Sequence, residues 1–452
     1  MDDDLLGNMA AAGQLQVSNS ASQYKYAALF GRLSANYRQR YLLNLNIRRD
    51  GSSRFGPANR FSNFGAIGAA WIFSEEAPVK GLLRWLTYGK LRASAGITGN
   101  DQIGDYRYLD AWATATAYGY AGNTAGVLPT RPFNQNFEWE KVRKLEMGLE
   151  LGLLKDRFLL SVAYFNNRSS NQLVSYKLPN ITGFTSILRN LDAEIQNAGL
   201  ELELSSKNMA HARFSWESAF NISFPRNRLL RYPGLEQSSD RYNYSIGQPL
   251  RIVYAYHYTG VDPQQGVYTF ADLDRNGVIS SPGDLEVAGT IEQDFFGGLT
   301  NRISYGNFEL SFLLHFVKQT GRNYLATLSS VPGTLSNQPL LVLDRWQQPG
   351  NVTPLARFTA TATTDAYRKF TNYRSSSALI EDASYLRLRN LHFSYTLTGA
   401  LLHKVGLSRA RLYAEGQNLF TLTKYKGSDP ETQSMTALPP LKIVAAGIQI
   451  TL

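Results

Sequence analysis

The chain contains one short motif whose residue types and spacing suit a metal ion. It runs Asp272-Leu-Asp274-Arg-Asn276-Gly277-Val-Ile279, and Asp284 follows. Carboxylate or amide oxygens at the first, third and fifth positions, then a glycine for a sharp turn, are how a loop wraps Ca²⁺. The closing carboxylate comes one residue late. The sequence therefore predicts a calcium site with Asp272, Asp274, Asn276 and Asp284 as ligands, with a plain Asx-rich turn as the alternative.

Pairs of glutamates form the second pattern that could carry chemistry. Glu201 and Glu203 share one face of a predicted strand, and Glu146 and Glu150 share another. Paired carboxylates hydrolyse glycosides in many enzymes, but such pairs also recur wherever a strand faces water, and we favour that interpretation. The five histidines are scattered, and no HExxH, GxSxG or phosphate-loop pattern is present. The sequence predicts no catalytic residues and no enzyme.

Aromatic side chains gather in two predicted loops and could stack on a sugar or a peptide. Membrane-edge girdles and ordinary loop packing use the same residue types, so all three roles stay open. The candidate substrate-binding residues are Tyr106, Tyr108, Trp112, Tyr118, Tyr120, Tyr254, Tyr256 and Tyr258.

These candidates must be positioned by β-strands, because the chain alternates apolar and polar residues almost throughout. In Tyr41–Arg48 the side chains of Leu43, Leu45 and Ile47 share one face, and polar side chains occupy the other. The same alternation predicts about thirteen strands. They are expected near residues 27–37, 41–48, 64–73, 90–96, 145–153, 158–165, 197–204, 213–224, 297–305, 308–316, 384–397, 411–422 and 444–452.

The spacing of these strands predicts how they are connected. Short turns alternate with long loops, which is the asymmetry of outer-membrane barrels. It places the C-terminus on the short-turn, periplasmic side and residues 1–23, a polar segment, in an external loop. A short helical turn is expected near Leu82–Trp85. Within 384–397 the apolar parity flips, which predicts a β-bulge near Arg389–Asn390.

Composition agrees with strands that have lipid on one side and water on the other. Aromatic residues make up 12% of the 452 residues and charged residues only 18%, below the quarter or so usual in soluble domains. The chain has no apolar run of the roughly 18 residues that a membrane-spanning helix needs, so membrane insertion is expected as a barrel. There is no cysteine, and the net charge of +10 is spread out. We expect no nucleic-acid partner.

Several stretches resemble one family closely. They are RYLL…RRDGSSRFG from Arg40, LRASAGITGNDQIGDY (91–106), WEKVRKLEMGLELGLLKDR (139–157), NAGLELEL (197–204), SYLRLRNLHFSYTL (384–397) and GQNLFTLTKYKGSDPE (416–431). These runs resemble SusC/RagA-type TonB-linked outer-membrane transporters. The resemblance implies a 22-stranded barrel with a plug, a SusD-like surface lipoprotein as partner, and energy from the TonB complex acting on the plug.

An odd strand count does not close an antiparallel ring, and the acidic start is not a secretory signal. We therefore expect residues 24–452 to be the C-terminal part of a TonB-dependent receptor barrel, an all-β antiparallel transmembrane structure whose remaining strands and plug are encoded elsewhere. The expected function is import of glycan fragments or peptides, with no required cofactor and with outer-membrane lipid as a neighbour. The alternatives are a passive pore without a plug and a soluble or surface β-rich glycan-binding module.

Overall fold

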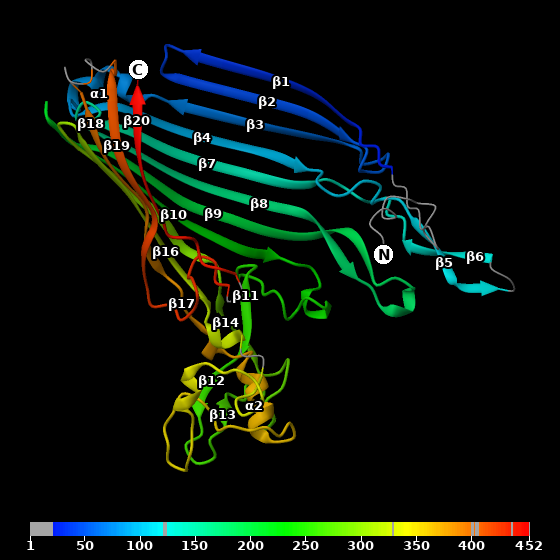
Figure 1. Ribbon diagram of the computed structural model, residues 1–452. Helices are drawn as coiled ribbons and strands as arrows, with labels where there is room; N and C mark the ends of the chain where they lie inside the picture. The colour runs from blue at the N-terminus through cyan, green and yellow to red at the C-terminus, as the bar shows by residue number, and fades with distance from the viewer. Residues whose placement is uncertain are drawn as a thin grey trace, which may run out of the picture.

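The fold is a curved wall of antiparallel strands that carries long loops at one end (Figure 1). The computed structural model describes residues 21–120, 124–327, 330–398, 402, 406–434 and 437–451. Thirteen strands follow one another in the wall, as expected from the sequence, and a short strand joins them at one side. The wall consists of β1 (Tyr26–Tyr37), β2 (Tyr41–Ser52), β3 (Phe61–Trp71), β4 (Leu86–Asn100), β7 (Glu140–Leu153), β8 (Phe158–Lys177), β9 (Ser186–Ala210), β10 (Phe214–Arg231), β15 (Gln293–Tyr305), β16 (Phe308–Arg322), β18 (Tyr385–Leu397), β19 (Arg409–Thr423) and β20 (Ile443–Thr451), with β17 (Ile380–Asp382) paired to β16.

Short and long connections alternate around the wall, which confirms the predicted asymmetry. Residues 38–40, 154–157, 211–213 and 306–307 make short turns at one end. Residues 101–139, 232–292, 323–384 and 424–442 form the long connections at the other end. In the first turn Arg38 and Gln39 both adopt positive φ, at 52° and 55°, and the Arg40 N–H donates to the Tyr37 carbonyl at 3.1 Å, as in a type I′ turn.

One face of the wall is apolar and uncovered. Cross-strand register aligns Met147, Tyr164, Leu200 and Phe224 in one row over four neighbouring strands, and Met147 is 50% exposed. Leu43 is 41% exposed, and neither Leu202 nor Phe312 is buried. A soluble or surface β-rich glycan-binding module would need these side chains buried between two packed sheets. No second layer packs on them within the described part of the chain, so that alternative is wrong and the apolar face is the one that suits lipid.

The opposite face of the wall is polar. Lys90 and Arg92 both contact the Glu150 carboxylate at 3.2 Å, and Arg92 also pairs with Glu146. These paired charges suit a water-filled interior. Among the described helices, none is long and apolar enough to cross a membrane.

Two local predictions can be compared with the structure. The pairing of β18 with β19 shifts between Leu388 and Asn390, which confirms the bulge at Arg389–Asn390. The helical turn expected at Leu82–Trp85 is wrong, because the helix α1 spans Ala77–Leu82 and has Pro78 in its first turn, where a proline is well tolerated. Several strands also run further toward the long-loop end than predicted. In these extensions apolar and polar residues no longer alternate strictly; the extension of β8, for example, begins with the seven polar residues 166–172.

The long connections hold secondary structure of their own. A β5–β6 hairpin (Ala111–Tyr120 and Thr124–Arg131) lies in one of them. Residues 252–290, 324–327 and 330–379 form a tower beyond the wall, at the lower part of Figure 1, built from β11 (Ile252–Tyr256), β12 (Tyr258–Val261), β13 (Tyr268–Phe270), β14 (Leu285–Thr290) and the helix α2 (Asp365–Tyr373). The tower has its own core, in which Tyr268 and Tyr373 stack at 4.1 Å between ring centroids.

Candidate functional site

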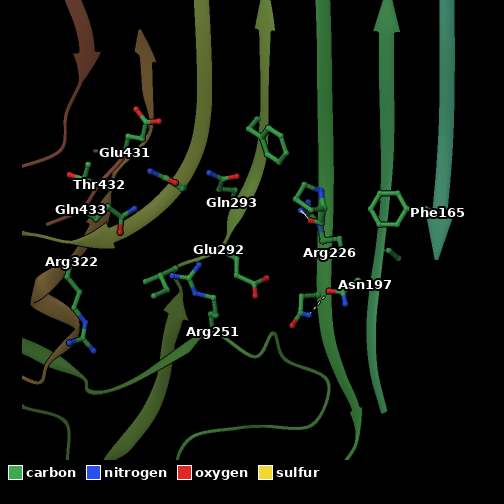
Figure 2. A pocket seen from close by; sticks show the side chains of 16 residues that line it. Phe165, Asn197, Arg226, Arg251, Glu292, Gln293, Arg322, Glu431, Thr432 and Gln433 are labelled. Atoms are coloured by element: carbon green, nitrogen blue, oxygen red, sulfur yellow. Dashed lines mark hydrogen bonds between the residues drawn. The ribbon is translucent and has the colours of Figure 1, made fainter. Parts of the chain in front are cut away.

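A cavity of about 860 Å³ opens on the polar face near the long-loop end of the wall (Figure 2). Neighbouring strands β8, β9 and β10 form one side of it, and the start of β15, the end of β16 and residues 431–433 form the other. Its lining comprises Phe165, Asn197, Ala198, Pro225, Arg226, Asn227, Arg251, Ile291, Glu292, Gln293, Phe296, Gln319, Arg322, Glu431, Thr432 and Gln433.

Hydrogen bonds fix the strand side of the cavity. The Asn227 amide donates to Asn197 Oδ1 at 2.7 Å across the β9–β10 pair, and Asn227 Oδ1 accepts from the Leu250 backbone N–H at 2.8 Å. Arg226 Nη1 donates to the carbonyls of Pro225 and Asp294, both at 2.8 Å. The Asn227 contact holds the segment that leads into the tower against β10, and the Arg226 contact joins β10 to the start of β15, so the cavity has a defined edge.

The other side is held by a buried ion cluster that we call the Arg387 clamp: Arg387, Arg389, Asp429 and Glu431. The Arg387 side chain is 2% exposed, pairs with Asp429 and Glu431, and donates from Nε to Thr421 Oγ1 at 2.9 Å. Arg389 binds both carboxylate oxygens of Glu431 at 2.8 Å. Asp429 also accepts the backbone N–H groups of Glu431 and Thr432. The clamp therefore folds residues 429–433 inward against the wall.

Three charged side chains that line the cavity have polar atoms without a partner among the described residues, and Figure 2 shows Arg251 beside Glu292. Within the described part of the chain, the guanidinium groups of Arg251 and Arg322 and the carboxylate of Glu292 make no hydrogen bond or ion pair. Burial raises the pKa of Glu292, and the positive charge of Arg251 opposes that rise. The cavity thus offers donors for a carboxylate and an acceptor for an ammonium group.

The structure brings most of the predicted calcium ligands together in a tower loop. One carboxylate oxygen from each of Asp272, Asp274 and Asp284 lies within 4.8 Å of the others. Asp284 is fully buried and accepts the N–H groups of Leu273 and Ser280 at 2.7 and 2.8 Å. Asp272 Oδ2 accepts the Gly277 N–H at 2.7 Å. These bonds are also those of an Asx-rich turn, so the calcium site stays a prediction.

The predicted aromatic residues fall into two separate regions, one beside the β5–β6 hairpin and one in the tower (Figure 1). Near the hairpin, Trp112 is 59% exposed and Tyr106 is 39% exposed, whereas Tyr108 packs beside the buried cluster of Phe55, Phe137 and Trp139. The side chains of Tyr118 and Tyr120 lie outside the described residues.

In the tower, the three predicted tyrosines mainly support loop packing. Tyr256 is 8% exposed, and the Tyr258 ring meets Tyr373 at 5.5 Å between centroids. Burial raises the pKa of the Tyr258 hydroxyl. Tyr254 donates to the Tyr244 carbonyl at 3.3 Å. Only Trp112 and Tyr106 keep a large open ring surface among the candidates that the structure describes.

Sequence reasoning missed the cavity residues. Arg251, Glu292, Arg322 and Glu431 come from four separate segments, and only the three-dimensional arrangement brings them together. The run GSDPE (427–431) was the one usable signal, because its two acids sit where the Arg387 clamp closes.

Comparison with known proteins adds a family match. Residues 2–419 match the model of the family described as TonB dependent receptor-like, beta-barrel. The chain is 31% identical to TonB-dependent receptor P3 of Formosa agariphila over 92% of its own length and 43% of that protein. It is 28% identical to TonB-dependent receptor SusC of Bacteroides thetaiotaomicron, over 92% of its own length and 42% of that protein. The chain thus spans less than half the length of these curated relatives.

Among solved structures, the fold is similar to the structure of the RagAB peptide transporter. The TM-score is 0.80 at 23% identity, and the match covers 97% of this chain and 49% of that one. At this identity the match speaks for the fold, which is an antiparallel barrel wall with long loops at one end.

Proposed function

The chain belongs to the TonB dependent receptor-like β-barrel family, as a barrel portion of SusC/RagA type, and we propose that it helps to import peptides through the outer membrane. Its place is the outer membrane, and its family is one of transporters and not of enzymes. In this proposal the chain supplies wall, external loops and part of the substrate chamber.

The observation that carries the proposal is the charged cavity on the polar face. It lies at the long-loop end, where a solute from outside arrives first, and it contains Arg251, Arg322 and Glu292 with free polar atoms. A peptide brings a terminal carboxylate, a terminal ammonium and backbone amides, which match such a mixed set. Charge-assisted hydrogen bonds of this kind are stronger than neutral ones.

Glycan fragments are the second candidate substrate. The specific observation in their favour is the open indole of Trp112, 59% exposed on the β5–β6 hairpin, with Tyr106 nearby in sequence. Sugars stack on open aromatic faces, but a neutral glycan in the cavity would leave the charges of Arg251 and Glu292 without ionic partners. The cavity therefore favours peptides.

We extend the proposal to the partners. The similar RagAB structure is that of a peptide transporter, and by analogy we propose that this chain works with a SusD-like surface lipoprotein. The tower and the neighbouring loops are where a lid would meet the chain. Energy would come from the TonB complex through a plug, which distinguishes this proposal from a passive pore.

The test is a binding titration with the full-length transporter, purified with its lipoprotein partner. Probes are a tetrapeptide with a free C-terminal carboxylate, the same peptide as its amide, and a neutral tetrasaccharide. Arg251→Gln should weaken binding of the free acid on the order of tenfold, the scale of one lost charge-assisted bond. Arg374→Gln, an exposed tower cation outside the cavity, should change it less than about twofold.

Two outcomes would contradict peptide import. One is that the free acid and the amide bind with equal affinity and that Arg251→Gln does not change this affinity. The other is binding of the tetrasaccharide alone, lost in Trp112→Ala, which would favour glycan import. Uptake that continues without the TonB complex would instead support the passive pore.

A further inference from the structure

We propose that the lipid-facing side of the wall carries a binding site for a phosphorylated lipid headgroup, formed by Arg143, Arg168 and Arg228 at the long-loop edge of the apolar belt. This site lies on the face opposite the cavity and does not depend on the substrate. The occupant we infer is a phosphorylated lipid of the leaflet on the long-loop side.

The pairing register places the three arginines in one row. Arg143 of β7 pairs directly with Arg168 of β8, Arg168 pairs with Gln196 of β9, and Gln196 pairs with Arg228 of β10. Neighbouring strands lie about 4.8 Å apart, so the row spans about 15 Å. That width fits one phosphorylated headgroup.

Strand parity shows that this row faces lipid. The register is unbroken from Lys141 to Leu153 in β7, so Arg143 shares its face with Met147. Arg168 shares its face with Tyr164 in β8, and Arg228 shares its face with Phe224 in β10. Four residues separate Arg168 from Tyr164, about 13 Å along the strand and about 10 Å along the membrane normal at the usual tilt. Headgroups lie at that height above the apolar belt.

The charges of the row are poorly compensated by the protein. Arg168 contacts Glu194 at 3.3 Å, and its side chain is still 49% exposed. Arg143 and Arg228 are exposed, and within the described residues neither has a hydrogen-bonding or ion-pair partner. Like charges directly opposite each other, as in the Arg143–Arg168 pair, destabilise a sheet. An anion bound between them removes that repulsion.

The opposite edge of the same strands is different. Its outward row is Leu153, Phe158, Ser206 and Ser218, which carries no charge. Ser218 Oγ donates to Asn301 Oδ1 at 2.6 Å, so the polar groups there satisfy one another. The basic row is therefore specific to the long-loop edge. Guanidinium groups bind phosphate oxygens in a bidentate fashion, which a neutral headgroup does not permit.

The test measures binding of diphosphoryl lipid A, and of the same lipid after dephosphorylation, to the full-length protein purified in detergent. The triple variant Arg143→Gln/Arg168→Gln/Arg228→Gln should bind the phosphorylated lipid on the order of tenfold more weakly, or worse. The parent's affinity should fall between about 50 mM and about 300 mM salt. A matched control, Arg38→Gln/Lys155→Gln/Arg213→Gln, removes three exposed cations from the short-turn edge and should bind like the parent.

Three results would overturn the proposal: equal binding of both lipids by the parent, undiminished binding by the triple variant, or an equal loss in the control. If the triple variant fails to assemble, the single variants Arg143→Gln and Arg228→Gln decide the question. Each should weaken binding several-fold, and parent-like affinity in both would refute the site.

Discussion

Removing the central cation of the Arg387 clamp should release the loop that it holds. In Arg387→Met, the Asp429 carboxylate, 8% exposed as a side chain, loses its cation, whereas Glu431 keeps Arg389. An uncompensated buried charge costs about 3 to 5 kcal/mol. We expect the lower end, about 3 kcal/mol, because residues 424–433 lie at the loop end and can open to water.

Trypsin is a suitable probe, because Lys424 and Lys426 lie in the loop that the clamp holds. When local opening is fast relative to cleavage, the cleavage rate follows the population of the open form. A loss of about 3 kcal/mol therefore predicts cleavage on the order of 100 times faster in Arg387→Met. The readout is the rate at which the full-length band disappears for folded protein in detergent, with heat-modified migration as the check on the barrel.

Two further variants test whether the faster cleavage is caused by the uncompensated buried charge or by a general loss of contacts. Arg389→Gln leaves Glu431 paired with Arg387, and it should speed cleavage less than about fivefold. In the double variant Arg387→Met/Asp429→Asn, the neutral amide oxygen still accepts the N–H groups of the loop backbone, and the buried negative charge is removed. Its cleavage should be slower than in Arg387→Met alone. Cleavage of Arg387→Met within about threefold of the parent would refute the reasoning.

Further predictions concern the wall, the cavity and the tower loop. Leu149→Arg, on the lipid-facing side, should destabilise the barrel by about 2 to 4 kcal/mol in urea titration of refolded protein, whereas Ser161→Arg on the polar face should be nearly neutral. Because burial raises the pKa of Glu292, this group takes up a proton at a higher pH than an ordinary glutamate does. Binding of a carboxylate peptide should then strengthen as the pH falls from neutral toward the usual carboxyl range, a trend that should disappear in Glu292→Gln. If the tower loop binds calcium, it should also bind Tb³⁺ with luminescence sensitised by nearby tyrosines, and Asp274→Asn should abolish that signal.

Much of the wall could be predicted from the sequence because lipid on one side and water on the other impose a strict period of two. The parity flip in Leu388–Leu391 even located the bulge, since a bulge is what restores the apolar face. The sequence did not predict the parts of the strands where this period of two is no longer imposed. Beyond Phe165, β8 continues to Lys177, and its next seven residues, 166–172, are all polar, so the period of two ends there and did not predict the rest of the strand.

The sequence did not predict the cavity or the row of Arg143, Arg168 and Arg228, for a different reason. Arg251, Arg322 and Glu431 meet only after three long loops fold back over the wall. Arg143 and Arg228 read as two isolated charges 85 positions apart until the register of four strands is known. The tower tyrosines illustrate the converse case, in which aromatic residues in a loop suggested ligand contact and the structure places them largely in a small core.

The tower is a loop region that is already folded without a bound partner. Tyr268, Phe370, Tyr373 and Leu379 are each no more than 3% exposed, so most of the entropy of ordering this segment is already lost in the isolated chain. A visiting molecule would then meet a rigid surface and associate without a slow rearrangement.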